Sequence, residues 1–113
     1  MKLLIAGSRS IKTFDFSKHI PEETDLIICG GANGIDRLAE QYADRKKISK
    51  LVLRPQYKRY GKGAPLKRNE IMVNLADKIL IVWDGISSGS KYTADYAIKQ
   101  NKPIEIITID NHK

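Results

Sequence analysis

The stretch Leu-Ile-Ile-Cys-Gly-Gly-Ala-Asn-Gly-Ile-Asp, residues 26–36, decides the fold of this chain. Its first four residues form an unbroken apolar run, which is typical of a strand buried on both faces of a parallel sheet. After Gly34 the apolar residues recur at helical spacing, as Ile35, Leu38, Ala39, Tyr42 and Ala43. The stretch therefore predicts a strand, a glycine turn and a helix in direct succession, with Asn33 as the helix N-cap.

The glycine turn of this stretch has two interpretations. Backbone without Cβ atoms can approach a ligand closely, and the following helix directs its free N–H groups and positive dipole end toward the turn. Gly30, Gly31 and Gly34 would then help to hold an anion. Alternatively, the three glycines only make a tight connection between strand and helix, because such turns also occur where nothing binds.

The rest of the chain continues this alternation of short apolar runs and amphipathic segments. Further strands are predicted at residues 3–6, 51–53, 79–83 and 104–109, followed by a polar end at 110–113. Helices are predicted at residues 11–20, at residues 65–76 and around residues 94–98. The buried stripe of the second helix is expected to consist of Ile71, Met72, Leu75 and Ala76. In the third helix the expected buried residues are Ala94, Ala97 and Ile98. The pattern predicts an α/β fold, a three-layer doubly wound parallel sheet of about five strands in the order 3-2-1-4-5.

Length and composition limit the possibilities. The 113 residues are expected to form one domain, 1–113, and the formal charge of +7 favours anionic partners. Cys29 lies within a predicted buried strand, so we expect a core residue rather than a nucleophile. No signal-peptide pattern, membrane-spanning run or metal-ligand spacing is evident, so we expect a cytoplasmic protein without a membrane partner or metal site.

Three turns rich in small residues follow predicted strands. In the order 3-2-1-4-5, the first and fourth strands flank the point where the connections diverge and leave a crevice. Residues 7–9 and 84–90 would face this crevice, with residues 30–36 beside them. The sequence therefore predicts a ligand site at the carboxyl edge of the sheet, and the basic connection at residues 56–64 is expected to be a loop that could act as its lid.

The same turns carry motifs that resemble a known family. In chain order these are Ala6-Gly7-Ser8-Arg9, residues 30–36, Arg68-Asn69-Glu70, and Trp83-Asp84-Gly85 with Ser87 and Gly89. Over nearly the whole chain they resemble the YspA-type branch of the SLOG superfamily, which is named after the Smf/DprA DNA-processing proteins and the LOG phosphoribohydrolases. The resemblance implies a Rossmann-like fold, a nucleotide or nucleotide-derived ligand, and commonly a homodimer.

The motifs and the predicted topology together give a set of candidate ligand-binding residues. These are Gly7, Ser8, Arg9, Gly30, Gly31, Ala32, Asn33, Gly34, Asp36, Arg68, Asn69, Trp83, Asp84, Gly85, Ser87, Gly89 and Ser90. Arg9 could bind a phosphate at two points or pair with an acidic neighbour. Asp36 could serve the helix dipole, a ribose hydroxyl or Arg9. Trp83, Tyr57 and Tyr60 could stack on a base, although we expect Trp83 rather to close the core and the two tyrosines to fit a lid.

One position departs from the hydrolase pattern. LOG-type enzymes carry Pro-Gly-Gly-x-Gly-Thr-x-x-Glu after the fourth strand, and here Thr93 stands where that pattern has its catalytic glutamate. A threonine cannot accept a proton near neutral pH, so carboxylate-assisted cleavage loses its main group. Asp84 is a weak substitute, and Asp95 is expected to lie on the surface.

Three functional hypotheses follow. The first is binding of a nucleotide or ADP-ribose-like ligand by a sensor, carrier or sequestering protein, and no cofactor is firmly implied. The second is an N-glycosidic hydrolase that acts on nucleoside monophosphates. The third is single-stranded nucleic-acid binding of the DprA type, which the positive charge permits.

Overall fold

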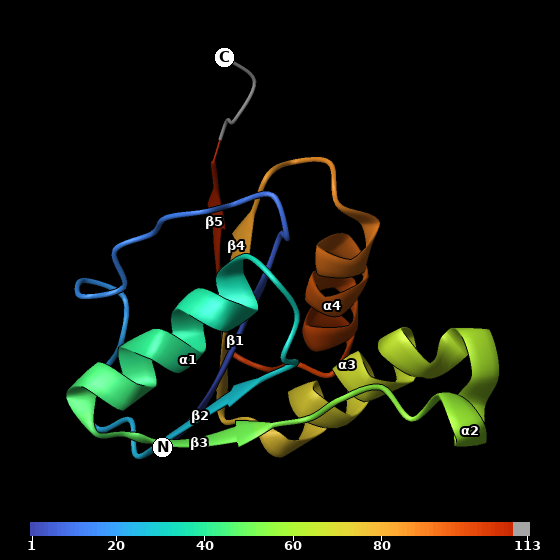
Figure 1. Ribbon diagram of the computed structural model, residues 1–113, viewed down its shortest axis with the longest axis horizontal. Helices are drawn as coiled ribbons and strands as arrows, with labels where there is room; N and C mark the ends of the chain where they lie inside the picture. Colours follow the sequence, from blue (N-terminus) through green and yellow to red (C-terminus); the bar gives the residue numbers. More distant parts are fainter. Residues whose placement is uncertain (110–113) are drawn as a thin grey trace.

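A computed structural model describes residues 1–109 of the chain and contains a five-stranded sheet (Figure 1). Every strand pairing is parallel, and the order is β3-β2-β1-β4-β5. The strands are β1 (Lys2–Gly7), β2 (Leu26–Cys29), β3 (Ser49–Val52), β4 (Lys78–Trp83) and β5 (Ile104–Thr108). The predicted strands and their order are confirmed. The predicted polar end at 110–113 lies outside the described residues.

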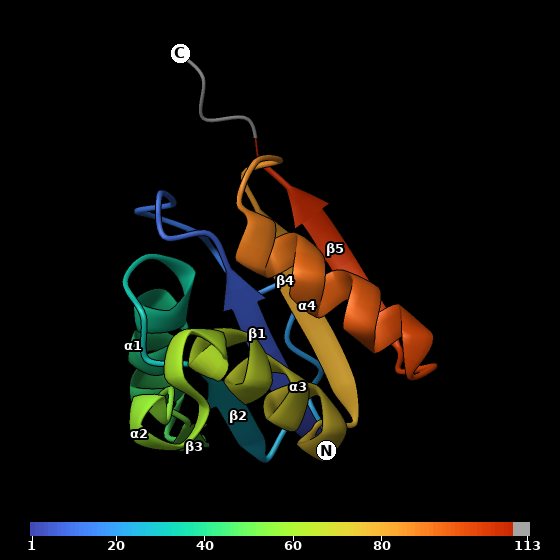
Figure 2. The same cartoon turned by 90° about the vertical axis from the view of Figure 1, so that its right-hand side faces the viewer.

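Three long helices complete the layers on the two faces of the sheet (Figure 2). Helix α1 (Ile35–Lys46) covers one face, and helices α3 (Ala64–Leu75) and α4 (Ser88–Lys99) cover the other. Alternate residues of β1 serve the two layers: Leu3 and Ile5 pack with α1, whereas Leu4 and Ala6 pack with α3 and α4. The predicted α/β architecture is therefore confirmed, and both faces of the central strands are buried as the apolar runs indicated.

The predicted helix at residues 11–20 is wrong. This segment is an irregular connection whose two anchors, Ile11 and Phe16, are buried against the α1 side of the sheet. The amide of Ser17 donates a hydrogen bond to Oδ1 of Asp15 at 2.9 Å, a local turn that competes with helical pairing. Phe14 and Phe16 stack edge to face with ring centroids 4.9 Å apart, a contact between residues two apart that a helix does not allow.

The predicted loop at residues 56–64 is also wrong. It consists of a single-turn helix, α2 (Tyr57–Tyr60), and a 3₁₀ turn, η1 (Gly61–Gly63), which lead directly into α3. Gly61 ends α2 with a φ of 58°, a left-handed conformation that glycine adopts without strain. Pro65 lies in the first turn of α3, as predicted.

The buried faces of α3 and α4 differ in part from the predicted stripes. Ile71, Leu75 and Ile98 are 37%, 41% and 55% exposed, so their predicted burial is wrong. The residues that face the sheet are Met72 and Val73 in α3, Ala76 just after it, and Ala94 and Ala97 in α4. Sequence spacing defines a stripe only to within a residue or two, and the contacts of a helix set its rotation about its axis.

Candidate functional site

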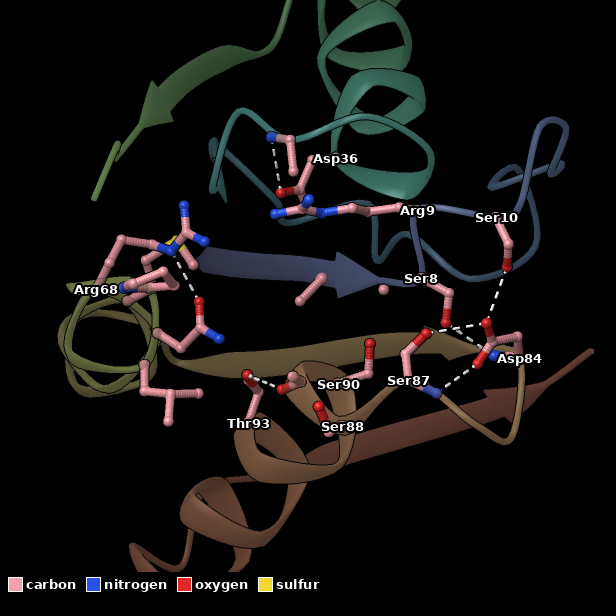
Figure 3. Close-up of a pocket in the computed structure, with 18 residues that line it drawn as sticks. Ser8, Arg9, Ser10, Asp36, Arg68, Asp84, Ser87, Ser88, Ser90 and Thr93 are labelled. Atoms are coloured by element: carbon pink, nitrogen blue, oxygen red, sulfur yellow. Dashed lines mark hydrogen bonds between the residues drawn. The ribbon is translucent and has the colours of Figure 1, made fainter. Parts of the chain in front are cut away.

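A cavity of about 480 Å³ opens at the carboxyl edge of the sheet, between the turns after β1, β2 and β4 and the first turns of α3 (Figure 3). This volume is within the range of about 300 to 1,000 Å³ that is typical of small-molecule sites. The structure brings together at its wall the following residues of the predicted set: Gly7, Ser8, Arg9, Ala32, Asp36, Arg68, Asn69, Asp84, Ser87, Gly89 and Ser90. The three turns thus meet at one edge of the sheet.

The other residues of the predicted set lie outside this wall. They are Gly30, Gly31, Asn33, Gly34, Trp83 and Gly85. Trp83 packs against the core, and its indole N–H donates to the carbonyl of Ser87 at 2.9 Å, so it closes the core rather than facing the cavity. Asn33 is not the N-cap of α1, because Gly34 occupies that position and the Asn33 side chain accepts a hydrogen bond from Arg37.

Other wall residues were not in the predicted set. They are Ala6, Ser10, Pro65, Leu66, Met72, Ser88 and Thr93. Ser10 and Ser88 belong to the same two turns, so the turn motifs could have indicated them. The three residues of α3 could not be found in this way, because they depend on the rotation of that helix. Neither Tyr57 nor Tyr60 contributes to the wall, and Tyr60 lines a separate shallow hollow beside β3.

Two glycines of the turn after β2 are required by packing. Gly34 has a φ of 75°, and a Cβ there would lie 2.4 Å from the carbonyl oxygen of Ser8. A Cβ on Gly30 would lie 2.6 Å from Nη1 of Arg68. At these positions the tight-turn interpretation explains the glycines, because their missing side chains make room for neighbouring turns and side chains.

Ser8 and Asp84 join the turns after β1 and β4. The hydroxyl of Ser8, which is buried, accepts a hydrogen bond from the Asp84 amide at 2.9 Å. The Asp84 carboxylate accepts hydrogen bonds from the hydroxyls of Ser10 and Ser87 and from the amides of Ile86 and Ser87, at 2.8–2.9 Å. Desolvation acts to raise the Asp84 pKa, but these hydrogen bonds together hold it well below its ordinary value. Asp84 therefore stays ionised and weakly basic, which suits a structural role better than proton transfer.

The N-terminus of α4 forms one wall of the cavity. Within residues 1–109, the amides of Ser88, Gly89 and Ser90 donate no hydrogen bond, as expected for the first turn of a helix. Ser90 is only 6% exposed, and its hydroxyl points into the cavity without a partner in the described part of the chain (Figure 3). Thr93, by contrast, donates its hydroxyl to the Gly89 carbonyl at 2.9 Å. This wall therefore offers unused donors and a positive dipole end.

Arg9 and Arg68 bring positive charge to the cavity in different ways. Arg68 is fixed: its Nη1 donates to the carbonyls of Gly30 at 2.7 Å and Leu53 at 3.1 Å, and its Nε donates to Asn69. Burial lowers the pKa of Arg68, and the charge of Arg9 acts in the same direction. Arg9 is exposed, and its guanidinium makes no ion pair or hydrogen bond with any residue of the described range 1–109. Arg9 is the cation of this wall that a ligand can engage.

Asp36 is the buried carboxylate of the site. It lies in the first turn of α1, is 7% exposed, and accepts a hydrogen bond at Oδ2 from the Ala32 amide at 3.1 Å. Burial raises the pKa of Asp36, and the Ala32 hydrogen bond and the charge of Arg68 only partly oppose this effect. A group in this situation is a candidate for ligand recognition.

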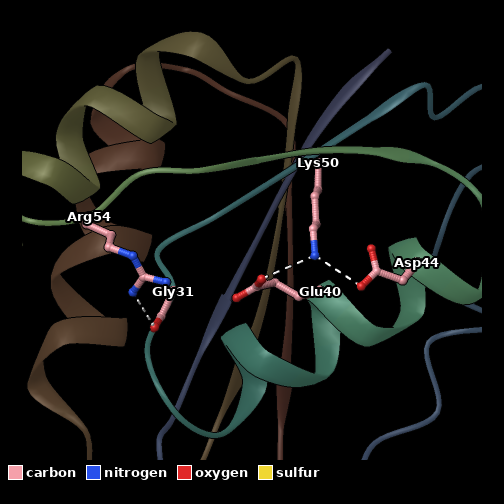
Figure 4. Close-up of polar contacts among 5 residues, drawn as sticks. All are labelled: Gly31, Glu40, Asp44, Lys50 and Arg54. Atoms are coloured by element: carbon pink, nitrogen blue, oxygen red, sulfur yellow. Dashed lines mark hydrogen bonds and ion pairs between the residues drawn. The ribbon is translucent and has the colours of Figure 1, made fainter.

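Polar contacts outside the cavity hold the turn after β2 and helix α1 against β3 and the residues that follow it (Figure 4). Lys50 lies between Glu40 and Asp44 of α1, at 3.4 and 3.0 Å, and Arg54 donates to the Gly31 carbonyl at 3.2 Å. Pairs of this exposed kind contribute little to stability, because solvent screens them. None of these side chains lines the cavity, and they are surface contacts rather than a second site.

Cys29 is buried in β2 as predicted. Burial, together with the nearby charges of Asp36 and Glu40, raises the pKa of its thiol to about 12, so it is an inert core group near neutral pH. Across residues 1–109, no three acidic, histidine or cysteine side chains gather as a metal-binding group. In the same range, no helix has the length and apolar character needed to span a membrane.

Comparison with known protein families gives a match over part of the chain. The protein-family model described as DNA recombination-mediator protein A matches residues 48–112, which is more than half of the chain. Searches of curated proteins and of solved structures gave no match. The narrower resemblance to the YspA-type branch stays a prediction. The chain belongs to the family of DNA recombination-mediator protein A, the Smf/DprA group of the SLOG superfamily that its turn motifs resemble.

Proposed function

We propose that the chain binds a nucleotide or nucleotide-derived ligand, such as an ADP-ribose-like compound, in the cavity at the carboxyl edge of the sheet. The observation that carries this proposal is the hydroxyl of Ser90, which opens into the cavity beside the unpaired amides of α4 and makes no hydrogen bond within residues 1–109. Donors that open into a cavity and are not used within the protein can exchange water for the oxygens of a ligand.

The anionic part of the ligand belongs at this wall. The amides of the first turn of α4 and the positive end of its dipole favour a phosphate. Arg9 adds an exposed positive charge from the turn after β1, and hydrogen bonds to charged groups contribute about 1.5 to 3 kcal/mol each. The net charge of +7 also favours an anionic ligand.

The rest of the wall suits an apolar ring. Ala6, Leu66 and Met72 line the cavity on the α3 side. Small-molecule sites typically combine such apolar surface with a few convergent polar groups. A nucleotide has both parts, so its phosphate would lie at α4 and its base beside α3.

Thermal unfolding in the presence of a nucleotide panel tests this proposal. A ligand at about one hundred times its dissociation constant adds about 2.7 kcal/mol, which raises the Tm by several degrees. Ser90→Ala and Arg9→Ala should each reduce the shift. Ser49→Ala, on an exposed edge of β3, and Arg45→Ala, in the last turn of α1, are the matched controls and should leave it unchanged. An unchanged Tm across the panel would contradict the proposal.

A second candidate is single-stranded nucleic-acid binding. The matching family is described as a mediator of DNA recombination, and the segment from α2 to the start of α3 presents Lys58, Arg59 and Lys62 beside Tyr57, which is 60% exposed. Cations interleaved with an exposed aromatic ring suit a nucleic-acid strand. The affinity for an oligonucleotide should then fall steeply with salt and should fall again in the double variant Lys58→Ala, Lys62→Ala. Absent or salt-insensitive binding would remove this candidate.

The hydrolase hypothesis has less support. Thr93 is engaged with the Gly89 carbonyl, and hydrogen bonds hold Asp84 in its weakly basic form. Neither side chain is suited to proton transfer during glycosidic cleavage. Release of free base from a nucleotide, abolished by Asp84→Asn, would be needed to restore this hypothesis.

A further inference from the structure

We propose that Asp36 makes the site selective for a ribonucleotide over a deoxyribonucleotide, by accepting a hydrogen bond from a sugar hydroxyl of the ligand; this inference rests on the proposed function. Asp36 lines the cavity, and only 7% of its surface is exposed. Its Oδ2 accepts a hydrogen bond from the Ala32 amide, and the Gly30 amide also stabilises the charged carboxylate, whereas no residue of the range 1–109 places a hydrogen bond on Oδ1. A hydroxyl donor would complete the coordination of this carboxylate.

The neighbours of Asp36 leave this acceptor open. Arg68 directs Nη1 to the carbonyls of Gly30 and Leu53, and no ion pair joins it to Asp36 within residues 1–109. Gly30 keeps the space beside the carboxylate free, since a Cβ there would lie 2.9 Å from Oδ2. A capping role does not explain the position either, because the N-cap of α1 is Gly34 and the Asp36 carboxylate binds an amide of the preceding turn.

The position of Asp36 relative to α4 suits the two ends of a sugar phosphate. Asp36 follows β2 and the first turn of α4 follows β4, with β1 between these strands in the sheet. Two strand spacings, or about 10 Å, therefore separate β2 from β4. A carboxylate repels a phosphate, so the anionic group of the ligand is directed to α4 and a neutral donor is favoured at Asp36. In a nucleotide the sugar hydroxyls lie a few bonds from the phosphate and provide this donor.

The sharpest test compares sugars on the unaltered protein. Calorimetric titrations would use the four ribonucleoside monophosphates and ADP-ribose, each with its 2′-deoxy counterpart. We expect the ribose form to bind at least about tenfold more tightly, because a lost hydrogen bond to a buried charged group has at least this effect on affinity. In Asp36→Asn we expect the ratio between the two sugars to fall severalfold toward unity. Asp44→Asn, the same substitution in the same helix at an exposed position, should keep the ratio of the unaltered protein.

The outcomes separate this inference from the proposed function. Equal affinity for ribose and deoxyribose in the unaltered protein would overturn the role of Asp36 while nucleotide binding stands. Asp36→Asn could instead keep the sugar preference and lose the discrimination among bases. This result would place a base amine at Asp36 and would also overturn the inference. If no compound of the panel binds, both proposals fail. The variant is expected to fold, since the Asn carbonyl can accept the Ala32 hydrogen bond, and the sugar comparison in the unaltered protein does not depend on it.

Discussion

The hydroxyl of Ser8 accepts a hydrogen bond from the backbone amide of Asp84 at 2.9 Å, and this contact joins two turns that are 76 residues apart in the sequence. The backbone of Ser8 extends the connection on both sides, since its amide donates to Val82 at 3.0 Å and its carbonyl accepts from Ile35 at 3.3 Å. One buried residue thus holds the ends of β1 and β4 and the start of α1 together. The cavity depends on this junction.

Ser8→Ala should destabilise the protein. The substitution leaves the Asp84 amide without its acceptor, and the loss of one partner from a buried hydrogen bond costs about 1 to 3 kcal/mol. Urea unfolding should show a lower midpoint with an unchanged slope. Ser49→Ala, at an exposed position of β3, is the matched control and should stay within about 0.5 kcal/mol. Equal stability of the two variants would show that Ser8 does not hold the junction.

The contribution of Asp84 should depend on pH. Its folded-state pKa lies below the ordinary 3.8, so the unfolded chain binds the proton more readily. The stabilisation is therefore complete above about pH 4 and is lost as the pH falls toward the folded-state value. The unfolding free energies of the unaltered protein and Asp84→Asn should differ most at about pH 7, and the difference should shrink steadily as the pH falls below about 4.

An exposed aspartate provides the comparison for this pH experiment. Asp95 lies on the surface of α4, where it pairs with Lys91. Asp95→Asn should change stability by less than about 0.5 kcal/mol at either pH. A constant difference between the unaltered protein and Asp84→Asn across the acid range would contradict the role given to the Asp84 hydrogen bonds.

Arg68→Met should lower stability by about 2 to 3 kcal/mol, because it leaves the Gly30 and Leu53 carbonyls without their donor and removes the positive charge that opposes the burial of Asp36. Its neighbour Lys67, which is half exposed and pairs only loosely with Glu70 at 3.7 Å, is the control. Lys67→Met should have an effect near zero in the same chemical unfolding measurement. Tolerance of Arg68→Met would mean that α3 is positioned without this contact.

The glycines that surround the site should differ sharply in their tolerance of alanine. Gly34→Ala requires a left-handed conformation and places a Cβ 2.4 Å from the Ser8 carbonyl, so we expect a loss of more than about 2 kcal/mol. Gly63→Ala meets nothing within 4 Å and has a φ of −82°, so it should be neutral or slightly stabilising. Differential scanning calorimetry of the two variants measures this contrast, and a similar Tm for both would contradict it.

The sheet could be predicted from the sequence because the residues that indicate each strand lie within or next to that strand. The three central strands, β1, β2 and β4, contain short apolar runs that end at a glycine or a charged residue, and the alternation with helices restricts the order of the strands. The convergence of three turns at one edge then follows from the order. These features needed no knowledge of side-chain contacts.

The details that depend on tertiary contacts could not be predicted in the same way. The rotation of α3 is set by contacts such as the one between Arg68 and Gly30, and it brings Leu66 and Met72 to the cavity while Ile71 remains partly exposed. Residues 11–20 contain enough apolar residues for a helix, yet Ile11 and Phe16 anchor an irregular segment instead. The packing role of Gly34 likewise depends on Ser8, a residue distant in the sequence.

The most direct test of the account is a map of amide chemical shifts during titration of the nitrogen-labelled protein with ribonucleoside monophosphates and ADP-ribose. Binding at the proposed site predicts the largest changes at the amides of Ser88, Gly89 and Ser90, with smaller changes around Arg9 and Asp36. Changes confined to residues 57–62, or none with any compound at millimolar concentration, would contradict the claim that this cavity is a nucleotide site.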